Sequence, residues 1–389
     1  MSFPLLSESL TRTLPGDPAP GFSQRTVKHA KFALDSVGGR YIVLCFFGSA
    51  AEPHAQAACK AAYSRPGLFD DKHASFFGVS IDPSDESEAR LIHRNPGHRH
   101  FYDFDLTASK LYGTLPQTTN RADALDALMP QWIVIDPTMR VISVVPFRED
   151  QSDISEAISL VEGLTPPQRF AGVELMAPVL YLPRVFEPEL CRHLIETYEA
   201  DGGEESGFMR EIDGRTIGVL DSGFKRRKDV TLTDDTLIRE LQMRFMRRVI
   251  PEISKVHQFK VTRMERYIVA CYAAEDGGHF SAHRDNLSKG TAHRRFAVSI
   301  NLNDDFDGGE VSFPEYGPRS FKAPPGGAVV FSCSLLHKVS KVTHGRRYAF
   351  LPFVYDDAAA RIRQQNARFI GLDKAASGGG AKEADIARA

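Results

Sequence analysis

The residues of this sequence with the clearest chemistry are His283, Asp285 and His337, and an arginine, Arg347, follows them closely. Two imidazoles and one carboxylate can occupy one triangular face of an octahedral metal ion. The opposite face then stays open for substrate and oxygen, which is the arrangement of a non-haem Fe(II) centre. The sequence therefore predicts that these three side chains form a metal site.

The triplet His283-Arg284-Asp285 has to be judged by its surroundings, because with 13 histidines in the chain about one His-x-Asp is expected by chance. The triplet follows a strand-like run at 263–272 and a Gly277-Gly278 turn, so it falls at the edge of a strand. His337 lies just past another strand-like run, and Arg347 opens the next one. A single histidine such as His337 is usually a hydrogen-bonded surface or core residue. Its occurrence together with the His-x-Asp triplet and Arg347 favours a metal ligand.

Short apolar segments separated by turn residues continue along the same part of the chain. At this spacing they indicate an antiparallel sandwich or barrel, in which strands distant in sequence become neighbours. Such a sheet would bring the triplet and His337 together. The segments are 263–272, 295–302, 310–313, 328–333 and 346–355.

Several motifs here match a known family: Val269-Ala-Cys-Tyr272, His283-Arg-Asp285, Val298-Ser-Ile-Asn-Leu-Asn303, Gly308-Gly-Glu310, Gly326-Gly-Ala-Val-Val-Phe331 and Gly345-Arg-Arg-Tyr348. On these motifs, residues 173–356 resemble the catalytic domain of prolyl 4-hydroxylases, within the Fe(II)- and 2-oxoglutarate-dependent dioxygenases. The resemblance implies a double-stranded β-helix (jelly-roll) with flanking helices, whose mouth holds Fe(2+) on His283, Asp285 and His337 as catalytic residues. It implies 2-oxoglutarate as co-substrate and O2 as oxidant, with L-ascorbate as a further candidate that keeps such iron reduced. The implied reaction hydroxylates a C–H bond of a prolyl, peptidyl or small-molecule substrate.

The resemblance also assigns residues to the co-substrate. It implies that Arg347 pairs with the distal carboxylate of 2-oxoglutarate, and a planar guanidinium suits that role because it can donate two parallel charge-assisted hydrogen bonds. Arg346 is expected on the outer surface, since neighbours on a strand point to opposite faces. Tyr272 is predicted to contact the co-substrate, with packing in a core as the alternative, and Asn301 is predicted to line the same polar face. Phe280 stands where many relatives have a tyrosine, and phenylalanine offers no hydroxyl there.

The first part of the chain alternates strand-like and helix-like segments, which is typical of an α/β layer fold. Residues 15–163 resemble the peroxiredoxin branch of the thioredoxin-like family, through the segment Phe46-Phe-Gly-Ser-Ala-Ala-Glu-Pro53. In that family threonine, proline and one further residue precede the reactive cysteine. Here the position of the cysteine itself is occupied by Ala55, whose side chain has no sulfur. Cys59 is then either a displaced nucleophile or a half-buried helical cysteine, and the second interpretation is preferred. His98-Arg99-His100 is expected in a surface loop.

A chain of 389 residues is longer than a chain that folds around a single hydrophobic core, so two domains are expected. We predict a thioredoxin/peroxiredoxin-like, redox-inactive domain at 15–163, a linker at 164–172, a dioxygenase domain at 173–356, and a C-terminal helix with a disordered tail at 357–389. Helices are expected at 84–94, 187–198 and 234–256. The polar segment 201–229 is either a mobile flap over the site or a surface loop.

Composition and charge narrow the remaining choices. A formal charge of −2 and 42% hydrophobic residues fit a soluble globular protein that binds neither nucleic acid nor a membrane. The basic run Lys225–Lys228 and the cluster Arg244, Arg247 and Arg248 are expected to be solvated faces. The odd number of cysteines, five, with no Cys-x-x-Cys pair, indicates reduced thiols and a cytoplasmic location. The oligomeric state and the primary substrate stay open.

Three other functions fit the same residues. The chain could be a thiol peroxidase that uses Cys59, or a non-enzymatic adaptor whose barrel is structural. Two histidines and a carboxylate also bind hydrolytic zinc, so the same ligands could hold Zn²⁺.

Overall fold

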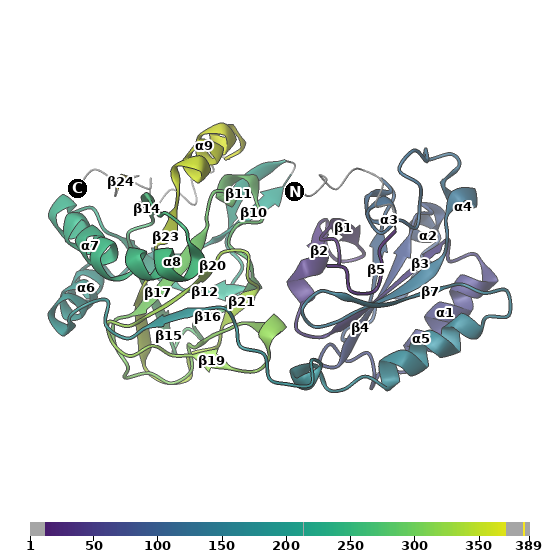
Figure 1. Ribbon diagram of the computed structural model, residues 1–389, viewed down its shortest axis with the longest axis horizontal. Coiled ribbons are helices and arrows are strands. Elements are labelled where there is room, and N and C mark those ends of the chain that lie inside the picture. The colour runs from purple at the N-terminus through teal and green to yellow at the C-terminus, as the bar shows by residue number, and fades with distance from the viewer. Residues whose placement is uncertain (1–11, 213, 371–383, 386–389) are drawn as a thin grey trace. The chain divides into compact units, whose positions relative to one another are not determined.

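The chain folds into two compact units in a computed structural model that describes residues 12–212, 214–370 and 384–385. The first unit lies within residues 1–176 together with 314–318, and the second within 177–313 together with 319–389 (Figure 1). This division places the predicted linker, 164–172, in the first unit.

The first unit is built on a seven-stranded mixed sheet in the order β2-β1-β5-β4-β3-β6-β7. The apolar run that begins at Tyr41 forms an interior strand of this sheet, and every residue of that strand is buried, as expected of a strand covered on both faces. Strands β3, β4 and β5 are parallel, whereas β6 and β7 run antiparallel. The strands are β1 (Ser23–Thr26), β2 (Phe32–Ala33), β3 (Tyr41–Gly48), β4 (Ala74–Ser80), β5 (His98–Tyr102), β6 (Gln131–Ile135) and β7 (Val141–Pro146).

Helices cover this sheet and complete a thioredoxin-like fold, as predicted. Helices α1 and α5 lie on one face over an apolar core, and a second core that includes Ala108 of α3 fills the other face (Figure 1). The helices are α1 (Pro53–Tyr63), α2 (Ser84–Ser87), α3 (Thr107–Leu111), α4 (Ala124–Ala127) and α5 (Ser152–Glu162).

Two predictions for the first unit were wrong. The helix expected at 84–94 ends at Ser87, because the Asp85 side chain turns into the core to accept hydrogen bonds from Ala50 and Ser80. Ala89 then takes a left-handed φ of 51° that no helix continues. The surface loop expected at 98–100 is instead strand β5, and His98 and His100 are fully buried in it.

The second unit consists of two antiparallel sheets that form a double-stranded β-helix. The smaller sheet has the order β12-β16-β21-β18-β19. The larger sheet has the order β24-β14-β23-β17-β22-β15-β13-β9, and β20 pairs with both β17 and β8. The strands are β8 (Leu180–Leu182), β9 (Glu204–Glu205), β10 (Phe208–Ile212), β11 (Arg215–Val219), β12 (Lys225–Arg226), β13 (Lys228–Thr231), β14 (Arg263–Glu265), β15 (Ile268–Ala273), β16 (His279–His283), β17 (Phe296–Asn301), β18 (Val311–Ser312), β19 (Ser320–Phe321), β20 (Ala328–Ser332), β21 (His337–Val339), β22 (Arg346–Phe350), β23 (Phe353–Tyr355) and β24 (Ala384–Asp385).

The larger sheet has one apolar and one polar face. Helices α6 (Pro188–Asp201), α7 (Asp235–Arg248) and α8 (Ile250–His257) bury the apolar face in one continuous core. Residues on alternate positions of β15, β17 and β22 belong to that core, and the residues between them point to the opposite, inner face. The alternation therefore decides which side chains can reach a site inside the β-helix.

Two further expectations for this unit were wrong. The helix expected over 234–256 is broken at Val249, because Pro251 lacks the N–H that a continuous helix needs. The strand expected over 263–272 is interrupted at Arg266, which has a φ of 63°. The segment 201–229 contains several short strands, among them the hairpin β10–β11, and its role as a flap stays a prediction.

Helix α9 (Asp357–Asn366) follows the last barrel strand. The predicted disordered tail from Ala375 falls outside the described residues, except for Ala384–Asp385, which pair with β14. Within the described residues, no helix combines the length and the apolar character needed to span a membrane.

Candidate functional site

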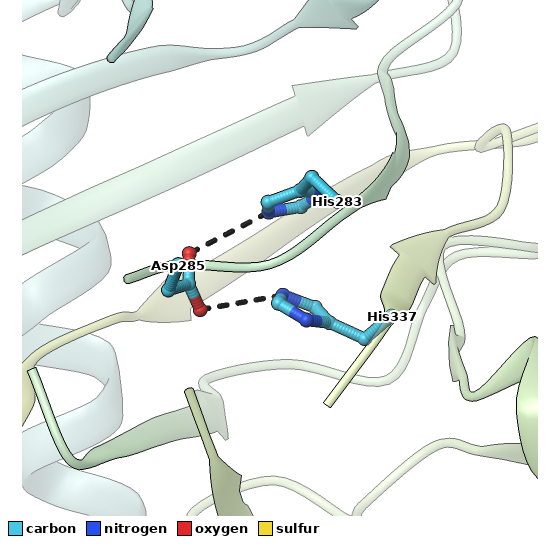
Figure 2. Close-up of side chains that lie close together, drawn as sticks. All are labelled: His283, Asp285 and His337. Atoms are coloured by element: carbon cyan, nitrogen blue, oxygen red, sulfur yellow. Dashed lines mark ion pairs between the residues drawn. The ribbon is translucent and has the colours of Figure 1, made fainter. Parts of the chain in front are cut away.

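His283, Asp285 and His337 come together at one end of the smaller sheet. Strands β16 and β21 are antiparallel and pair His283 directly with His337, so that register alone puts the two imidazoles side by side. Asp285 lies two residues on, and its backbone N–H donates to the Cys333 carbonyl at 3.0 Å. Figure 2 shows the carboxylate between the two rings, 3.6 Å from His283 Nε2 and 3.4 Å from His337 Nε2. One ligand atom from each residue lies within 4.8 Å of the others, which suits a single metal ion.

The hydrogen bonds of both rings fix the atom that faces the metal position. His283 Nδ1 is 2.7 Å from the Ser281 carbonyl, and His337 Nδ1 is 3.0 Å from the Leu335 carbonyl. A carbonyl oxygen only accepts, so each Nδ1 carries a proton and Nε2 is the nitrogen of each ring that remains for a metal ion. Both Nε2 atoms are directed toward Asp285 (Figure 2). Such outer hydrogen bonds are the usual way a protein orients histidine ligands.

The protonation states of the site also suit metal binding. Burial, and then the neighbouring His283, lowers the pKa of His337 to about 4, so its ring is neutral at physiological pH. Burial alone would raise the pKa of Asp285, but His337 and His283 outweigh it and hold that pKa well below its ordinary value. A neutral imidazole and an ionised carboxylate are the forms that bind metal.

Aromatic rings hold the two histidines in place. Phe280 stacks on His283 with ring centroids 3.5 Å apart, and Phe331 lies 4.6 Å from His337. The phenylalanine that departs from the family pattern thus covers one face of a candidate ligand and keeps water from it.

Arg347 lies on the inner face of the larger sheet and is 1% exposed. Its Nε donates to Asn301 Oδ1 at 2.9 Å, and one terminal nitrogen donates to Ser299 Oγ at 2.8 Å. The other terminal nitrogen is buried and has no hydrogen-bond partner in the described part of the chain. A buried guanidinium with a vacant donor and no carboxylate beside it is suited to an acidic ligand.

The neighbours of Arg347 divide as the alternation predicts. Arg346 points outward and pairs with Glu275 at 2.6 Å, which confirms its surface position. Asn301 accepts a hydrogen bond from Arg347 Nε through Oδ1 and donates one to the Ala323 carbonyl through Nδ2. The amide is therefore fixed and orients the arginine. Tyr272 lies opposite Arg347 in the strand register, and its ring is 5.3 Å from the Arg347 guanidinium.

The burial of two cations, Lys225 and Arg227, was not predicted from the sequence. Lys225 and Arg227 were expected on a solvated face, but each is only 6% exposed. Arg227 donates to the Tyr272 hydroxyl at 3.2 Å and to Asp229 at 2.6 Å. Their burial could have been suspected from their spacing. Lys225, Arg227 and Asp229 are every second residue, and every second residue of an extended chain points to the same face.

The first unit has no reactive thiol at the expected place. Ala55 is buried in α1, where the family has its cysteine. Burial raises the pKa of Cys59 to about 12, so its sulfur stays a protonated thiol and is a poor nucleophile. The Nε2 of His54 lies 3.0 Å from a carboxylate oxygen of the buried Asp153. The raised pKa of Cys59 disfavours the thiolate that a peroxidase using this residue would need.

Comparison with known families identifies the second unit. Residues 242–355 match the model of the 2OG-Fe(II) oxygenase superfamily, and this range contains His283, Asp285, His337 and Arg347. The second unit is an Fe(II)- and 2-oxoglutarate-dependent oxygenase. The oxygenase is an oxidoreductase of the dioxygenase class, and the donor set described above fits the Fe(2+) that this class uses.

Relatives of the oxygenase include bacterial proteins named PKHD-type hydroxylases. One from Pseudomonas fluorescens (strain Pf0-1) is 28% identical over 212 residues, which cover 51% of this chain and 86% of the relative. Another from Pseudomonas putida (strain KT2440) is 28% identical over 211 residues, with the same coverage.

The unit that accompanies the oxygenase matches another family. Residues 15–144 match the model of the AhpC/TSA family, in agreement with the thioredoxin-like sheet. Similar solved structures include peroxidoxin BcpB of Mycobacterium tuberculosis, with 17% identity, a TM-score of 0.34 and coverage of 40% of this chain and 99% of that one. AhpC of the same organism has 17% identity, a TM-score of 0.30 and coverage of 40% and 97%.

Proposed function

We propose that His283, Asp285 and His337 bind one Fe(II), that Arg347 binds the distal carboxylate of 2-oxoglutarate, and that the enzyme hydroxylates an unactivated C–H bond. The observation that carries this proposal is the convergence of two imidazoles and one carboxylate, with one ligand atom of each within 4.8 Å of the others. Iron bound there would supply oxygen activation coupled to the conversion of 2-oxoglutarate to succinate and CO2.

The residues around the site have distinct roles in this proposal. The two histidines and Asp285 leave one face of the metal open for the co-substrate and O2. Asn301 and Ser299 hold the Arg347 guanidinium, so it needs little reorganisation when a carboxylate arrives. The Tyr272 ring lies against Arg347 and bounds the co-substrate position.

The substrate and the setting belong to the same proposal. The named hydroxylases among the relatives favour a prolyl or peptidyl residue or a small molecule with a comparable C–H bond. L-ascorbate is proposed as the reductant that returns oxidised iron to Fe(II). All five cysteines are unpaired and buried, which suits a reducing, cytoplasmic compartment.

Anaerobic titration of the full chain with Fe(II) and 2-oxoglutarate tests this function. We expect a visible charge-transfer band in the wild type, its loss in Asp285→Ala, and its retention in His279→Ala, which removes a histidine of the same strand outside the ligand set. Zn²⁺ gives no such band, so the titration also decides between iron and hydrolytic zinc. A band that persists in Asp285→Ala would contradict the assigned ligands.

Succinate release upon admission of O2 completes the test. The wild type should form succinate from 2-oxoglutarate slowly alone and faster with a suitable primary substrate, whereas Asp285→Ala should form none. An adaptor with a structural barrel would form none in either protein.

A further inference from the structure

A row of alternating charged residues connects the two sheets of the oxygenase. Lys225 belongs to β12, which pairs with the metal-bearing strand β16, and Asp229 belongs to β13, which pairs with β15 of the larger sheet. Arg227 lies between them. The three side chains share one face of the extended segment, and both cations are almost fully buried.

The charges of this row do not balance. The carboxylate of Asp229 accepts from Arg227 at 2.6 Å and lies 3.4 Å from Arg266, so it already faces two cations. The Lys225 ammonium donates to Ser206 Oγ at 2.7 Å and to the Gly207 carbonyl at 2.6 Å, and among the described residues it contacts no carboxylate. A buried ammonium with only neutral partners is costly, which indicates a site prepared for an anion.

Arg347 is the other buried cation without a carboxylate, and the proposed function already gives it one from 2-oxoglutarate. The proposed function assigns no anion to Lys225. Burial and then Arg227 hold the pKa of Lys225 well below its usual value, although Asp229 and Asp285 act in the opposite direction, and an anion bound beside Lys225 would favour its charged form. Arg227 adds a further donor, since its Nε is buried and has no hydrogen-bond partner in the described structure.

The position of Lys225 connects it to the metal centre. Lys225 is paired with Phe280 across the strands, and its Nζ lies 5.0 Å from the centre of the Phe280 ring. Phe280 stacks directly on His283. One aromatic ring, that of Phe280, therefore contacts both the Lys225 ammonium and a proposed metal ligand.

Further aromatic side chains lie beside Phe280, and Phe224 also lies 6.4 Å from His283. Phe224 lies 5.7 Å from Phe280 and 4.5 Å from Phe208, which opens the hairpin β10–β11. Met209, the next residue of that hairpin, is 47% exposed. A molecule whose charged end meets Lys225 would therefore have apolar surface beside its body.

We propose that Lys225 binds a carboxylate of the primary substrate, and that Phe280, Phe224 and Phe208 contact its apolar body, so the enzyme acts on apolar carboxylic acids of the amino-acid or peptide C-terminal class. A single compact ammonium suits one carboxylate, whereas a phosphate group usually has a nest of backbone N–H groups or several cations around it. This inference rests on the proposed function, because the substrate is placed relative to the iron and 2-oxoglutarate assigned above.

Matched acids and amides test the charge requirement. The anaerobic Fe(II) and 2-oxoglutarate complex of the full chain is titrated with N-acetyl-proline, N-acetyl-leucine and N-acetyl-phenylalanine, and with the primary amide of each, following the perturbation of the visible band. We expect at least one acid to bind about tenfold or more tightly than its amide in the wild type.

Lys225→Gln is the decisive variant, because it removes the charge but keeps an N–H donor for Gly207. We expect the acid to lose its advantage in Lys225→Gln, while the affinity for 2-oxoglutarate changes less than about twofold. The matched control is Lys228→Gln, which removes an exposed lysine 3.9 Å from Asp276 and should leave the acid preference intact. Ser206→Ala keeps the ammonium and removes one of its hydrogen bonds, so it should also keep the preference.

The outcomes separate the two proposals. A wild type that binds no acid more tightly than its amide overturns the inference, as does an acid preference that survives in Lys225→Gln. In either case a normal Fe(II) and 2-oxoglutarate band leaves the proposed function standing. If the wild type gives no band, the proposed function fails, and this inference fails with it.

Discussion

At the scale of single residues, burial decides the role of each cation in the oxygenase. Arg346 and Arg347 are adjacent in sequence, yet the first pairs with Glu275 at the surface and the second is buried without a counter-ion. The same contrast separates Lys228 from Lys225. The type of charge does not tell which member of each pair is buried. The alternation of side chains along the strand does.

Replacing Arg347 tests the co-substrate anchor. Arg347→Met removes the only guanidinium assigned to 2-oxoglutarate and should raise its dissociation constant roughly 30-fold or more, because a buried charge pair is lost. Titration of the anaerobic visible band measures this constant. Arg346→Met, the exposed neighbour, should stay within about twofold of the wild type. Equal losses in both variants would contradict the assignment.

Asp229 provides a pH-dependent test at the same scale. Burial alone would raise its pKa, but Arg227, Lys225 and Arg266 lower it to about 2 from 3.8. Because the folded pKa is depressed, the ionised carboxylate stabilises the protein fully above about pH 4, and this stabilisation is lost as the pH falls toward 2.

We therefore expect Asp229→Asn to lower the free energy of unfolding by about 3–5 kcal/mol at pH 7. The difference from the wild type should shrink by about 2 kcal/mol between pH 5 and pH 2, since the wild type then loses its own charge. Denaturant unfolding at several pH values measures this difference. A difference that stays constant over that range would show that the charge of Asp229 does not stabilise the fold.

At the scale of elements, turns control how closely strands approach the site. The Gly308-Gly309 turn before β18 has left-handed φ at both residues, and an added Cβ on Gly309 would lie 3.0 Å from Arg347 Cδ. A side chain there is strained and also presses on the co-substrate anchor. The glycine pair of this family motif is thus explained by backbone shape and by Arg347 together.

Gly309→Ala should destabilise the fold by about 1–2 kcal/mol and weaken 2-oxoglutarate binding several-fold. Gly202→Ala is a matched control, because Gly202 also has a left-handed φ but has no atom within 4 Å of the added Cβ. It should show a similar loss of stability with unchanged 2-oxoglutarate affinity. Thermal melts and band titration on both variants separate strain from displacement of Arg347.

At the scale of the whole molecule, each of the two units has apolar cores of its own. The proposed metal ligands and Arg347 all belong to the second unit, whereas the only tryptophan, Trp132, is fully buried in the first. Trp132 Nε1 donates to Asp153, so its fluorescence reports the packing of the first unit.

Ligand binding should therefore stabilise one unit selectively. Mn(II) and 2-oxoglutarate, each at about a hundred times its dissociation constant, should together stabilise the oxygenase unit by about 5.4 kcal/mol, since each ligand contributes about 2.7 kcal/mol. Calorimetry should show one component moving to higher temperature, while the tryptophan transition stays in place. A shift of both by the same amount would show that the two units unfold as one.

The sequence by itself determined the types of the two folds and pointed to the proposed metal donors. Periodicity and turn residues are local, so they predicted strands such as β3 and β15 and helices such as α1 and α5, and the His-x-Asp motif pointed to the ligands that the register of β16 and β21 places together. What depends on partners distant in sequence could not be read in this way. The burial of Lys225 and Arg227 and the role of Asn301 in holding Arg347 were decided only when β12, β13, β15, β17 and β22 came together. A charged side chain costs little in water and much in a core, and only the tertiary structure determines which of the two surrounds it.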